Sequence, residues 1–586
     1  MHWTYFAGAA SLGALGAALS GSSFLAPAGQ QDISPLSERC AALGDAMAQA
    51  WPEKGTRITA SIFRPAGPAP AQPGPPGMAP PAVTLPAHCD VTATMHERQG
   101  VDGARYAIRF HLRLPQDWNG RFFFEGGGGT NGELGSAIGR LSGEAKPALV
   151  QGYAVLSQDS GHDNAVNSDP KRGGPTAFGF DPQARADYGG SSLEPVTLAA
   201  RAVVAQFYGK PPQYSYFVGC SKGGQEGMAL AQRYPELYDG IVAGAPGFAL
   251  PRAALAEAWD TQQFAGVVKA KGETVTLASL AASFSDADLG LVRKAVLDAC
   301  DADDGLADGI VGAHGQCSSA RVLPVLKRSQ CSEAKQDSCL SAAQVGALER
   351  VHEGPRTSAG KPLYASFPWD AGWSDLGWRI WKIGSADGRI PSINVMMGGP
   401  SLATTFTVPP EAPGATPDAL LAYQLGFDFD RDAGAIYATG HGFTRSGWQD
   451  IGARSSDLAA FRKRGGRMIV PHGGSDPVFS INDTIAWWKE VDRAAGGKAA
   501  QFARVFPVPG MGHCQGGPAT DRYDAFGALV RWVEQGQAPE RIVATAGPMS
   551  PWNGRSRPLC PYPLVAVPKP GMTDGEKAGN FVCAKR

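Results

Sequence analysis

The sequence predicts an α/β protein in which a mostly parallel sheet, with helices on both faces, is interrupted by a large insertion. Short apolar segments typical of buried strands alternate with segments of helical periodicity. This alternation stops near residue 248 and resumes near residue 454. Strands that alternate with helices favour a parallel sheet. The 586 residues are enough for such a core and an inserted unit.

The elements before the insertion are expected in a fixed order. A helix is predicted at 32–51, followed at 64–86 by a proline- and glycine-rich loop of extended chain. Polar and apolar residues alternate at 106–114, which predicts a strand with one wet face. Apolar runs predict buried strands at 121–125, 152–157, 214–218 and 240–245, and helical periodicity predicts helices at 193–208 and 225–234.

The insertion differs in composition from the segments on either side. It is rich in Trp, Pro and Gly and contains irregular helices such as 285–299. After it we expect a helix at 457–464, strands at 467–470 and 504–508, and a helix at 524–534. The predicted organisation is a signal peptide at 1–28, a first core part at 29–247, a lid domain at 248–453 and a second core part at 454–586.

Residues 1–28 have features of an export signal. Residues 7–19 are small and apolar, and residues 26–28 are Ala-Pro-Ala, which places small residues where a signal peptidase cleaves. The alternative is a buried N-terminal helix. The apolar run is too short for a good transmembrane helix, and no later segment reaches the needed length, so we expect no membrane partner.

The ten cysteines favour disulfides in an oxidising compartment. Their number is even and none forms a C-x-x-C pair, which argues against zinc or thioredoxin-like chemistry; ten reduced thiols are the alternative. We therefore expect a secreted or periplasmic protein. Proximity in the chain suggests three pairs and leaves four cysteines unassigned: Cys300–Cys317, Cys331–Cys339 and Cys560–Cys583, with Cys40, Cys89, Cys220 and Cys514 remaining.

The charge distribution argues against nucleic acid as a partner. The formal net charge is −1 and no long run of one sign occurs, whereas binding phosphates requires a concentrated basic face. We expect a monomer that acts on a small molecule.

A candidate nucleophile lies between a predicted strand and a predicted helix. Residues 219–223 are Gly-Cys-Ser-Lys-Gly, which matches G-x-S-x-G. This turn would strain the backbone of Ser221 and aim its hydroxyl at the helix N-terminus, where N–H groups favour developing negative charge. The motif alone is common by chance, but this context predicts the nucleophile elbow of an α/β-hydrolase.

Partners for Ser221 are expected in the order acid, then histidine. Asp476 and His513 each lie in a glycine-rich loop just after a predicted strand, at the edge where open α/β sheets place functional residues. Taken singly, Asp476 could be a turn residue and His513 a surface histidine. His472 is a rival base but precedes the acid. The other candidate histidines are expected to be structural: His162, His314 and His441.

Backbone N–H groups are expected to form an oxyanion hole. One donor is the N–H of Lys222, and the second is assigned to Gly126, the first of four glycines after the strand 121–125. A phosphate-binding loop is the alternative, but neither of the usual phosphate-binding fingerprints follows.

The two cysteines beside Ser221 and His513 carry a family resemblance. Together with the motifs at 126–132, 159–162, 238–247 and 367–370, they make the chain resemble the tannase and feruloyl esterase family, which includes bacterial mono(hydroxyethyl) terephthalate hydrolases. The resemblance spans nearly the whole mature chain. It implies an α/β-hydrolase fold with a large inserted lid domain and a Cys220–Cys514 disulfide, which leaves Cys40 to pair with Cys89.

The resemblance also implies a structural calcium ion in the lid. Residues 300–310 resemble the family's calcium loop, with side chains of Asp301, Asp304 and Asp308 and carbonyls of Leu306 and Ile310 as ligands. Calcium prefers six to eight oxygen ligands, which agrees with this set. A solvated acidic turn is the alternative, and no organic cofactor is expected.

The implied substrates are esters of aromatic acids: gallates, hydroxycinnamates or terephthalate half-esters. Trp381 corresponds to a substrate-packing tryptophan of the half-ester enzymes, although it could equally be lid core. Those enzymes grip the free carboxylate with a lid arginine and close a phenylalanine on the ring. Here Ile393 and Met397 fall at these positions, and Arg389 lies close enough to substitute if the loop shifts.

We therefore expect a serine esterase that prefers neutral phenolic esters and has weak or no activity as a mono(hydroxyethyl) terephthalate hydrolase. Two other hypotheses remain: a serine peptidase on the same fold, and a calcium-dependent binding protein with a vestigial triad.

Overall fold

The structure, a computed structural model, describes residues 34–70, 83–142 and 145–586. The predicted export signal and residues 71–82 of the proline-rich loop lie outside the described residues. The loop is closed at its ends by two short paired strands, β2 (Gly67–Pro68) and β3 (Thr84–Leu85). In the described part of the chain, no helix is both long enough and apolar enough to cross a membrane.

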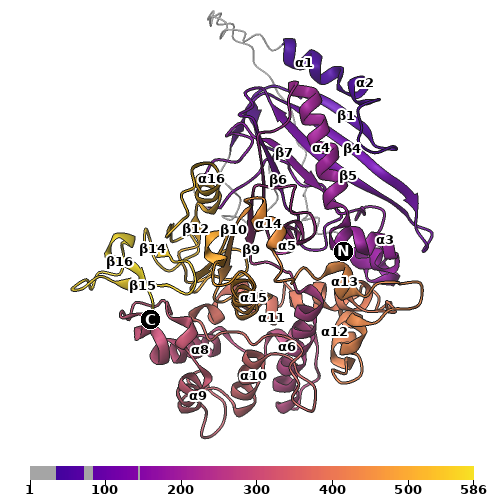
Figure 1. Cartoon of the computed structure of the whole chain (residues 1–586). Helices are drawn as coiled ribbons and strands as arrows, with labels where there is room; N and C mark the ends of the chain where they lie inside the picture. The colour runs from indigo at the N-terminus through magenta and orange to yellow at the C-terminus, as the bar shows by residue number, and fades with distance from the viewer. Residues whose placement is uncertain (1–33, 71–82, 143–144) are drawn as a thin grey trace, which may run out of the picture.

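A mixed sheet of nine described strands forms the centre of the protein (Figure 1). In spatial order its strands are β1 (Arg57–Arg64), β4 (His88–Gln99), β5 (Arg105–Pro115), β7 (Ala154–Gln158), β6 (Arg121–Glu125), β8 (Tyr214–Cys220), β9 (Gly240–Gly244), β10 (Arg467–Gly473) and β11 (Ala503–Val508). The six strands from β7 to β11 run parallel, as expected, whereas β1, β4, β5 and β7 pair antiparallel. Strands β1 and β4 were not predicted.

Helices cover both faces of the sheet, and strand β6 shows why. Its side chains alternate, so Phe122 and Phe124 join one apolar cluster while Phe123 joins another. The first cluster includes α4 (Leu193–Tyr208), α5 (Lys222–Arg233) and α15 (Ile481–Ala494), and the second includes α16 (Ala525–Gln535). The predicted helix 32–51 consists, in its described part, of the two short helices α1 (Ser34–Ala41) and α2 (Leu43–Met47), and α3 (Pro182–Ala186) precedes α4.

The chain between β9 and β10 forms the inserted, mainly helical part. Figure 1 shows helices α6, α8, α9, α10 and α12 gathered on one side of the sheet, away from α1 and α2. The helices of this segment are α6 (Leu250–Ala270), α7 (Leu277–Ala281), α8 (Asp286–Cys300), α9 (Ser319–Arg328), α10 (Ala342–Glu353), α11 (Leu376–Lys382), α12 (Pro417–Gly426), α13 (Gly447–Ile451) and α14 (Ala459–Lys463). Strands β9 and β10 nevertheless pair directly, so the segment is an insertion into the sheet topology.

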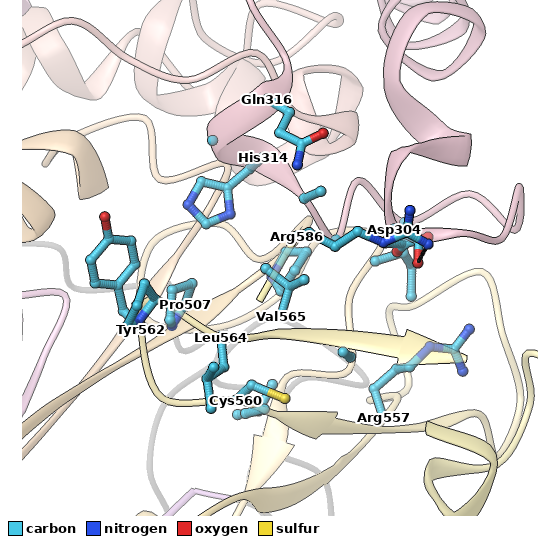
Figure 2. Close-up of a pocket in the computed structure, with 18 of the residues that line it drawn as sticks. Asp304, His314, Gln316, Pro507, Arg557, Cys560, Tyr562, Leu564, Val565 and Arg586 are labelled. Atoms are coloured by element: carbon cyan, nitrogen blue, oxygen red, sulfur yellow. Dashed lines mark hydrogen bonds between the residues drawn. The ribbon is translucent and has the colours of Figure 1, made fainter. Parts of the chain in front are cut away.

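Two small sheets lie near the C-terminus and were not predicted. They contain β12 (Arg522–Tyr523), β13 (Ile542–Thr545) and β14 (Ser556–Leu559), and β15 (Val565–Pro568) with β16 (Phe581–Ala584). A cavity of about 440 Å³ separates these strands from the loop that follows α8, and His314, Tyr562 and Val565 border it (Figure 2). This cavity does not include Ser221.

All ten cysteines form disulfides, in the pairs suggested by chain proximity and by the family resemblance. The pairs are Cys40–Cys89, Cys220–Cys514, Cys300–Cys317, Cys331–Cys339 and Cys560–Cys583.

Candidate active site

Ser221 occupies a sharp turn between β8 and α5, as the motif predicted. Its backbone lies at φ 65° and ψ −120°, a conformation that is strained for a residue with a side chain. Helix α5 begins at the next residue, three positions earlier than predicted. The hydroxyl-bearing residue is thus placed directly at a helix N-terminus, where unpaired N–H groups are available.

The glycines on either side of Ser221 allow this turn to pack. A Cβ atom at Gly219 would lie 2.5 Å from the backbone of Gly223, and a Cβ at Gly223 would lie 2.7 Å from the carbonyl oxygen of Gly127. The glycine-rich loop after β6 therefore lies against the elbow, and larger residues at these positions would force the two apart.

The predicted acid and base are in direct contact. Nδ1 of His513 lies 2.9 Å from Oδ2 of Asp476, and the Asp476 carboxylate also accepts hydrogen bonds from the backbone N–H groups of Val478 and Phe479. Asp476 follows β10 and His513 follows β11, two adjacent parallel strands, so their loops meet at one edge of the sheet. Because Asp476 occupies Nδ1, the other ring nitrogen of His513 is left to act on a substrate or nucleophile.

A disulfide joins the Ser221 and His513 neighbourhoods. Cys220 precedes Ser221 and Cys514 follows His513, and their Cα atoms are 6.1 Å apart across the bridge. The bridge connects positions separated by 294 residues in the sequence. The serine and the histidine are therefore brought together by a covalent link as well as by the sheet.

The charge of Asp476 is stabilised in place. Burial would raise its pKa, but the charges and hydrogen bonds of His513 and His472 outweigh burial and hold the pKa well below its ordinary value. His472 is not the base. Its ring nitrogens are 2.9 Å from the Thr484 hydroxyl and 3.0 Å from the Phe479 carbonyl, in a fully buried position.

A cavity borders Ser221 on the side of the lid. One wall of the cavity belongs to the α/β core and is formed by the glycine-rich loop and the elbow: Gly129, Thr130, Ser221 and Lys222. The opposite wall belongs to the lid and is formed by α6, α11 and the π-helical turns after α11: Leu250, Ala253, Glu257, Trp381, Met397 and Ser401. The rings of Trp381 and Phe479, which also line it, lie 5.4 and 5.3 Å from the ring of His513. The cavity thus borders Ser221, and two of its aromatic residues also contact the ring of His513.

Two predicted site residues are not where the sequence placed them. The N–H of Gly126 donates to the Val218 carbonyl at 2.9 Å and continues the strand pairing, so it is not free to bind an oxyanion. Arg389 does not line the cavity; its side chain is 86% exposed and pairs with Asp387. Trp381 and Met397 do line the cavity, as predicted.

Two buried acids that sequence reasoning missed hold the site loops. Glu226 accepts hydrogen bonds from the Gly127 N–H, the Asn131 amide and the Lys222 ammonium, at 2.9, 3.0 and 2.9 Å. It therefore fixes the glycine-rich loop to α5. The only earlier signal was its spacing of four residues from Lys222 on one helix.

Asp370 holds the loops of the acid and the base. Its carboxylate accepts a hydrogen bond from the Gly510 N–H at 2.8 Å, and a Cβ at Gly474 would lie 2.2 Å from it. Burial raises the pKa of Asp370 to about 6, although its hydrogen bonds oppose this. Its place in the motif at 367–370 marked the residue but not this role.

The three histidines that were expected to be structural do not line the cavity beside Ser221. His162 is fully buried and stacks on Phe178 with ring centroids 3.9 Å apart, and burial lowers its pKa to about 3. His314 lines the separate cavity of Figure 2, and His441 is exposed.

The acidic loop at 300–310 gathers carboxylates in a partly buried place. Burial, with the neighbouring charges of Asp308 and Asp301, raises the pKa of Asp304 to about 7. Such a set of acidic oxygens is the donor chemistry that calcium prefers. However, the Asp308 carboxylate contacts Arg557, and among the described residues no group of three or more His, Cys, Asp or Glu side chains is arranged to hold a metal ion.

Comparisons with known proteins agree with this geometry. A profile of the tannase and feruloyl esterase family matches residues 89–584. A mono(2-hydroxyethyl) terephthalate hydrolase of Piscinibacter sakaiensis is 46% identical over 572 residues, covering 94% of this chain and 92% of its own. A probable feruloyl esterase of Arthroderma benhamiae is 30% identical over 85% of this chain and 86% of its own.

A solved structure supports the fold. The crystal structure of feruloyl esterase B from Aspergillus oryzae matches 94% of this chain and all of its own, with a TM-score of 0.71 and 20% sequence identity. The chain thus has an α/β-hydrolase fold, and it belongs to the tannase and feruloyl esterase family of carboxylic-ester hydrolases.

Proposed function

We propose that the protein hydrolyses neutral esters of phenolic acids, such as gallates or hydroxycinnamates, through an acyl-enzyme on Ser221. The observation that carries this proposal is the cavity beside Ser221, which has aromatic walls and, among the described residues that line it, no unpaired cation. Its one basic side chain, Lys222, is buried and bound to Glu226 at 2.9 Å. A ring that carries a free carboxylate would have to be buried there without a counter-charge, which is costly.

The proposed reaction has two steps. His513 takes the proton of the Ser221 hydroxyl, and the serine oxygen attacks the ester carbonyl to form a tetrahedral intermediate. The bond to the alcohol then breaks, and the alcohol leaves with the proton from His513. Water next attacks the acyl-enzyme while His513 takes one of its protons. The bond between the acyl group and the Ser221 oxygen then breaks, the acid leaves, and His513 returns the proton to Ser221. In both steps Asp476 orients the imidazole and stabilises its charged form.

The oxyanion would be bound by backbone N–H groups. The N–H of Lys222, at the start of α5, is one proposed donor. The second would come from residues 128–130 of the glycine-rich loop, because Gly129 and Thr130 reach the cavity while the Gly126 and Gly127 N–H groups donate to Val218 and Glu226. Removing one such donor typically lowers turnover by about 10²–10³.

A panel of substrates tests the proposal. Values of kcat/KM would be compared for methyl gallate, methyl ferulate, mono(2-hydroxyethyl) terephthalate and a short peptide. We expect the phenolic esters to be best and the peptide not to be cleaved. The second candidate, a half-ester hydrolase, is favoured by the 46% identical relative. A preference of tenfold or more for the half-ester would establish it and overturn the first.

Ser221→Ala separates a catalyst from a binding protein with a vestigial triad. The variant should lose turnover and labelling by a fluorophosphonate probe while keeping the wild-type melting temperature. A wild-type protein that resists the probe at Ser221, or a variant with wild-type-like rates, would refute the catalytic assignment.

We also propose a structural calcium ion at the acidic loop. Asp301, Asp304 and Asp308 and the carbonyls of Leu306 and Ile310 would hold it, with Asp308 released from Arg557. The support is the loop sequence and its buried acidic oxygens. Metal analysis of the purified protein, and melting with and without a chelator, test this; a protein free of calcium whose melting temperature does not rise on adding calcium would refute it.

We also propose that the protein is exported from the cytoplasm and is a monomer. Five disulfides are consistent with an oxidising compartment outside the cytoplasm. N-terminal sequencing of the exported protein would test cleavage within residues 1–28, and light scattering would test the monomer.

A further inference from the structure

Glu257 is a buried acid in the wall of the cavity beside Ser221. It lies on the lid helix α6, is 7% exposed, and faces the space that Ser221, Trp381 and Met397 also border. A Cβ at Gly398 would lie 2.1 Å from Oε2 of Glu257. The carboxyl group therefore rests against the backbone of the opposite lid segment, and a glycine at 398 makes room for it.

The carboxyl group has no hydrogen-bond partner within the described part of the protein. By contrast, three other buried acids each hold at least one hydrogen bond: Glu226 with Gly127 and Lys222, Asp370 with Gly510, and Asp260 with Lys382. Other buried side chains among the described residues, such as Gln158 and Asn394, also have polar atoms without a partner, but they do not line this cavity, whereas Glu257 does. Because buried polar groups are usually hydrogen-bonded, the position of Glu257 in the cavity wall points to a partner supplied by a ligand.

The surroundings favour a neutral partner for Glu257. The base whose charge acts on Glu257, Lys382, is bound to Asp260 in a buried ion pair. Burial, with the charge of Asp260, raises the pKa of Glu257 to about 8, while Lys382 opposes this. A carboxyl group that retains its proton near neutral pH can both donate and accept a hydrogen bond. A phenolic hydroxyl can also do both, whereas a second carboxylate would meet an acid with no free cation beside it.

We propose that Glu257 determines specificity by hydrogen-bonding a hydroxyl group on the aromatic ring of the substrate. This inference rests on the proposed esterase function and names the feature of the substrate that the cavity recognises. The aromatic and apolar walls would hold the ring, and Glu257 would distinguish a hydroxylated ring from a bare one.

The test compares methyl gallate with methyl benzoate, which lacks ring hydroxyls. Steady-state kcat and KM would be measured for wild type, Glu257→Met and Glu257→Gln, and each rate divided by the alkaline hydrolysis rate of that ester to remove intrinsic reactivity. Wild type should prefer the gallate by tenfold or more. Glu257→Met should lower this preference by about tenfold, chiefly through KM, which is the usual effect of losing one hydrogen bond.

Two further variants make the result specific. Glu257→Gln keeps a donor and an acceptor and should retain most of the preference. Glu349→Met, on α10 and outside the cavity, is the matched control and should leave the preference unchanged. Equal wild-type rates on the two esters after normalisation, or an unchanged preference in a folded Glu257→Met, would overturn the proposal.

The outcome also separates this inference from the proposed function. If Glu257→Met fails to fold, equal normalised wild-type rates on the two esters still overturn the proposal, and so does a folded Glu257→Gln that loses the preference. If no ester is hydrolysed, the proposed function itself is wrong, whereas hydrolysis that is indifferent to ring hydroxyls removes only the role of Glu257.

Discussion

Replacing Glu257 with Gln should stabilise the protein at alkaline pH but not at acidic pH. In the folded protein the pKa of Glu257 is raised from 4.5 to about 8, mainly by burial. The folded state therefore keeps a proton that the unfolded chain loses near pH 4.5. It follows that this group costs no stability below pH 4.5, and that stability falls as the pH rises from 4.5 to 8.

The size of the effect follows from the two pKa values. The difference between them corresponds to about 5 kcal/mol of lost stability once the pH exceeds 8. Glutamine has nearly the same shape and does not titrate, so the variant lacks this loss. The group is almost entirely enclosed, at 7% exposure, so solvent screens the effect only weakly.

Melting temperatures of the two proteins at pH 5, 7 and 9 would measure this difference. We expect near-equal values at pH 5 and a variant that melts several degrees higher at pH 9. Glu349→Gln, on the lid helix α10, controls for a general effect of removing a lid acid. A difference between wild type and variant that is the same at all three pH values would refute the reasoning.

Three other changes test the site. Asp476→Asn should lower kcat by about 10⁴ while the melting temperature stays near wild type; a tenfold effect or less would contradict the triad. Replacing both Cys220 and Cys514 by Ala should lower the melting temperature and kcat, because the bridge spans 294 residues and constrains the unfolded chain by about 5–6 kcal/mol in the loop-closure estimate. Gly223→Ala puts a Cβ 2.7 Å from the Gly127 carbonyl and should lower kcat at least tenfold, with circular dichroism unchanged.

The sequence was sufficient for elements whose signals are local. The turn at Ser221 requires small residues on either side, between a strand and a helix. Gly219 and Gly223 lie within two residues of Ser221, so the sequence shows this pattern directly. Helix α4 was predicted with the bounds that the structure has. Asp476 and His513 could be predicted because each follows a buried strand. Adjacent parallel strands end at the same edge of the sheet, so the loops that follow them lie close together.

Features set by tertiary contacts were missed. Gly126 follows its strand, but only the pairing of β6 with β8 shows that its N–H is already bound to Val218. Arg389 is close in sequence to the cavity residues yet lies on the surface. Glu257 would pass for a solvated charge on an amphipathic helix, because its burial depends on the distant turn that contains Gly398.

A buried ion pair outside the cavity wall links the two lid segments that form it. Helix α6 carries Glu257 and, three residues later, Asp260; helix α11 carries Trp381 next to Lys382. Asp260 and Lys382 bind each other with side chains that are 1% exposed, and separating such a pair usually costs several kcal/mol. The distance between Glu257 on α6 and Trp381 on α11 is therefore fixed by a contact that lies outside the cavity. Substrate choice in this lid should consequently be more sensitive to loss of the Asp260–Lys382 pair than to most single changes among the apolar wall residues.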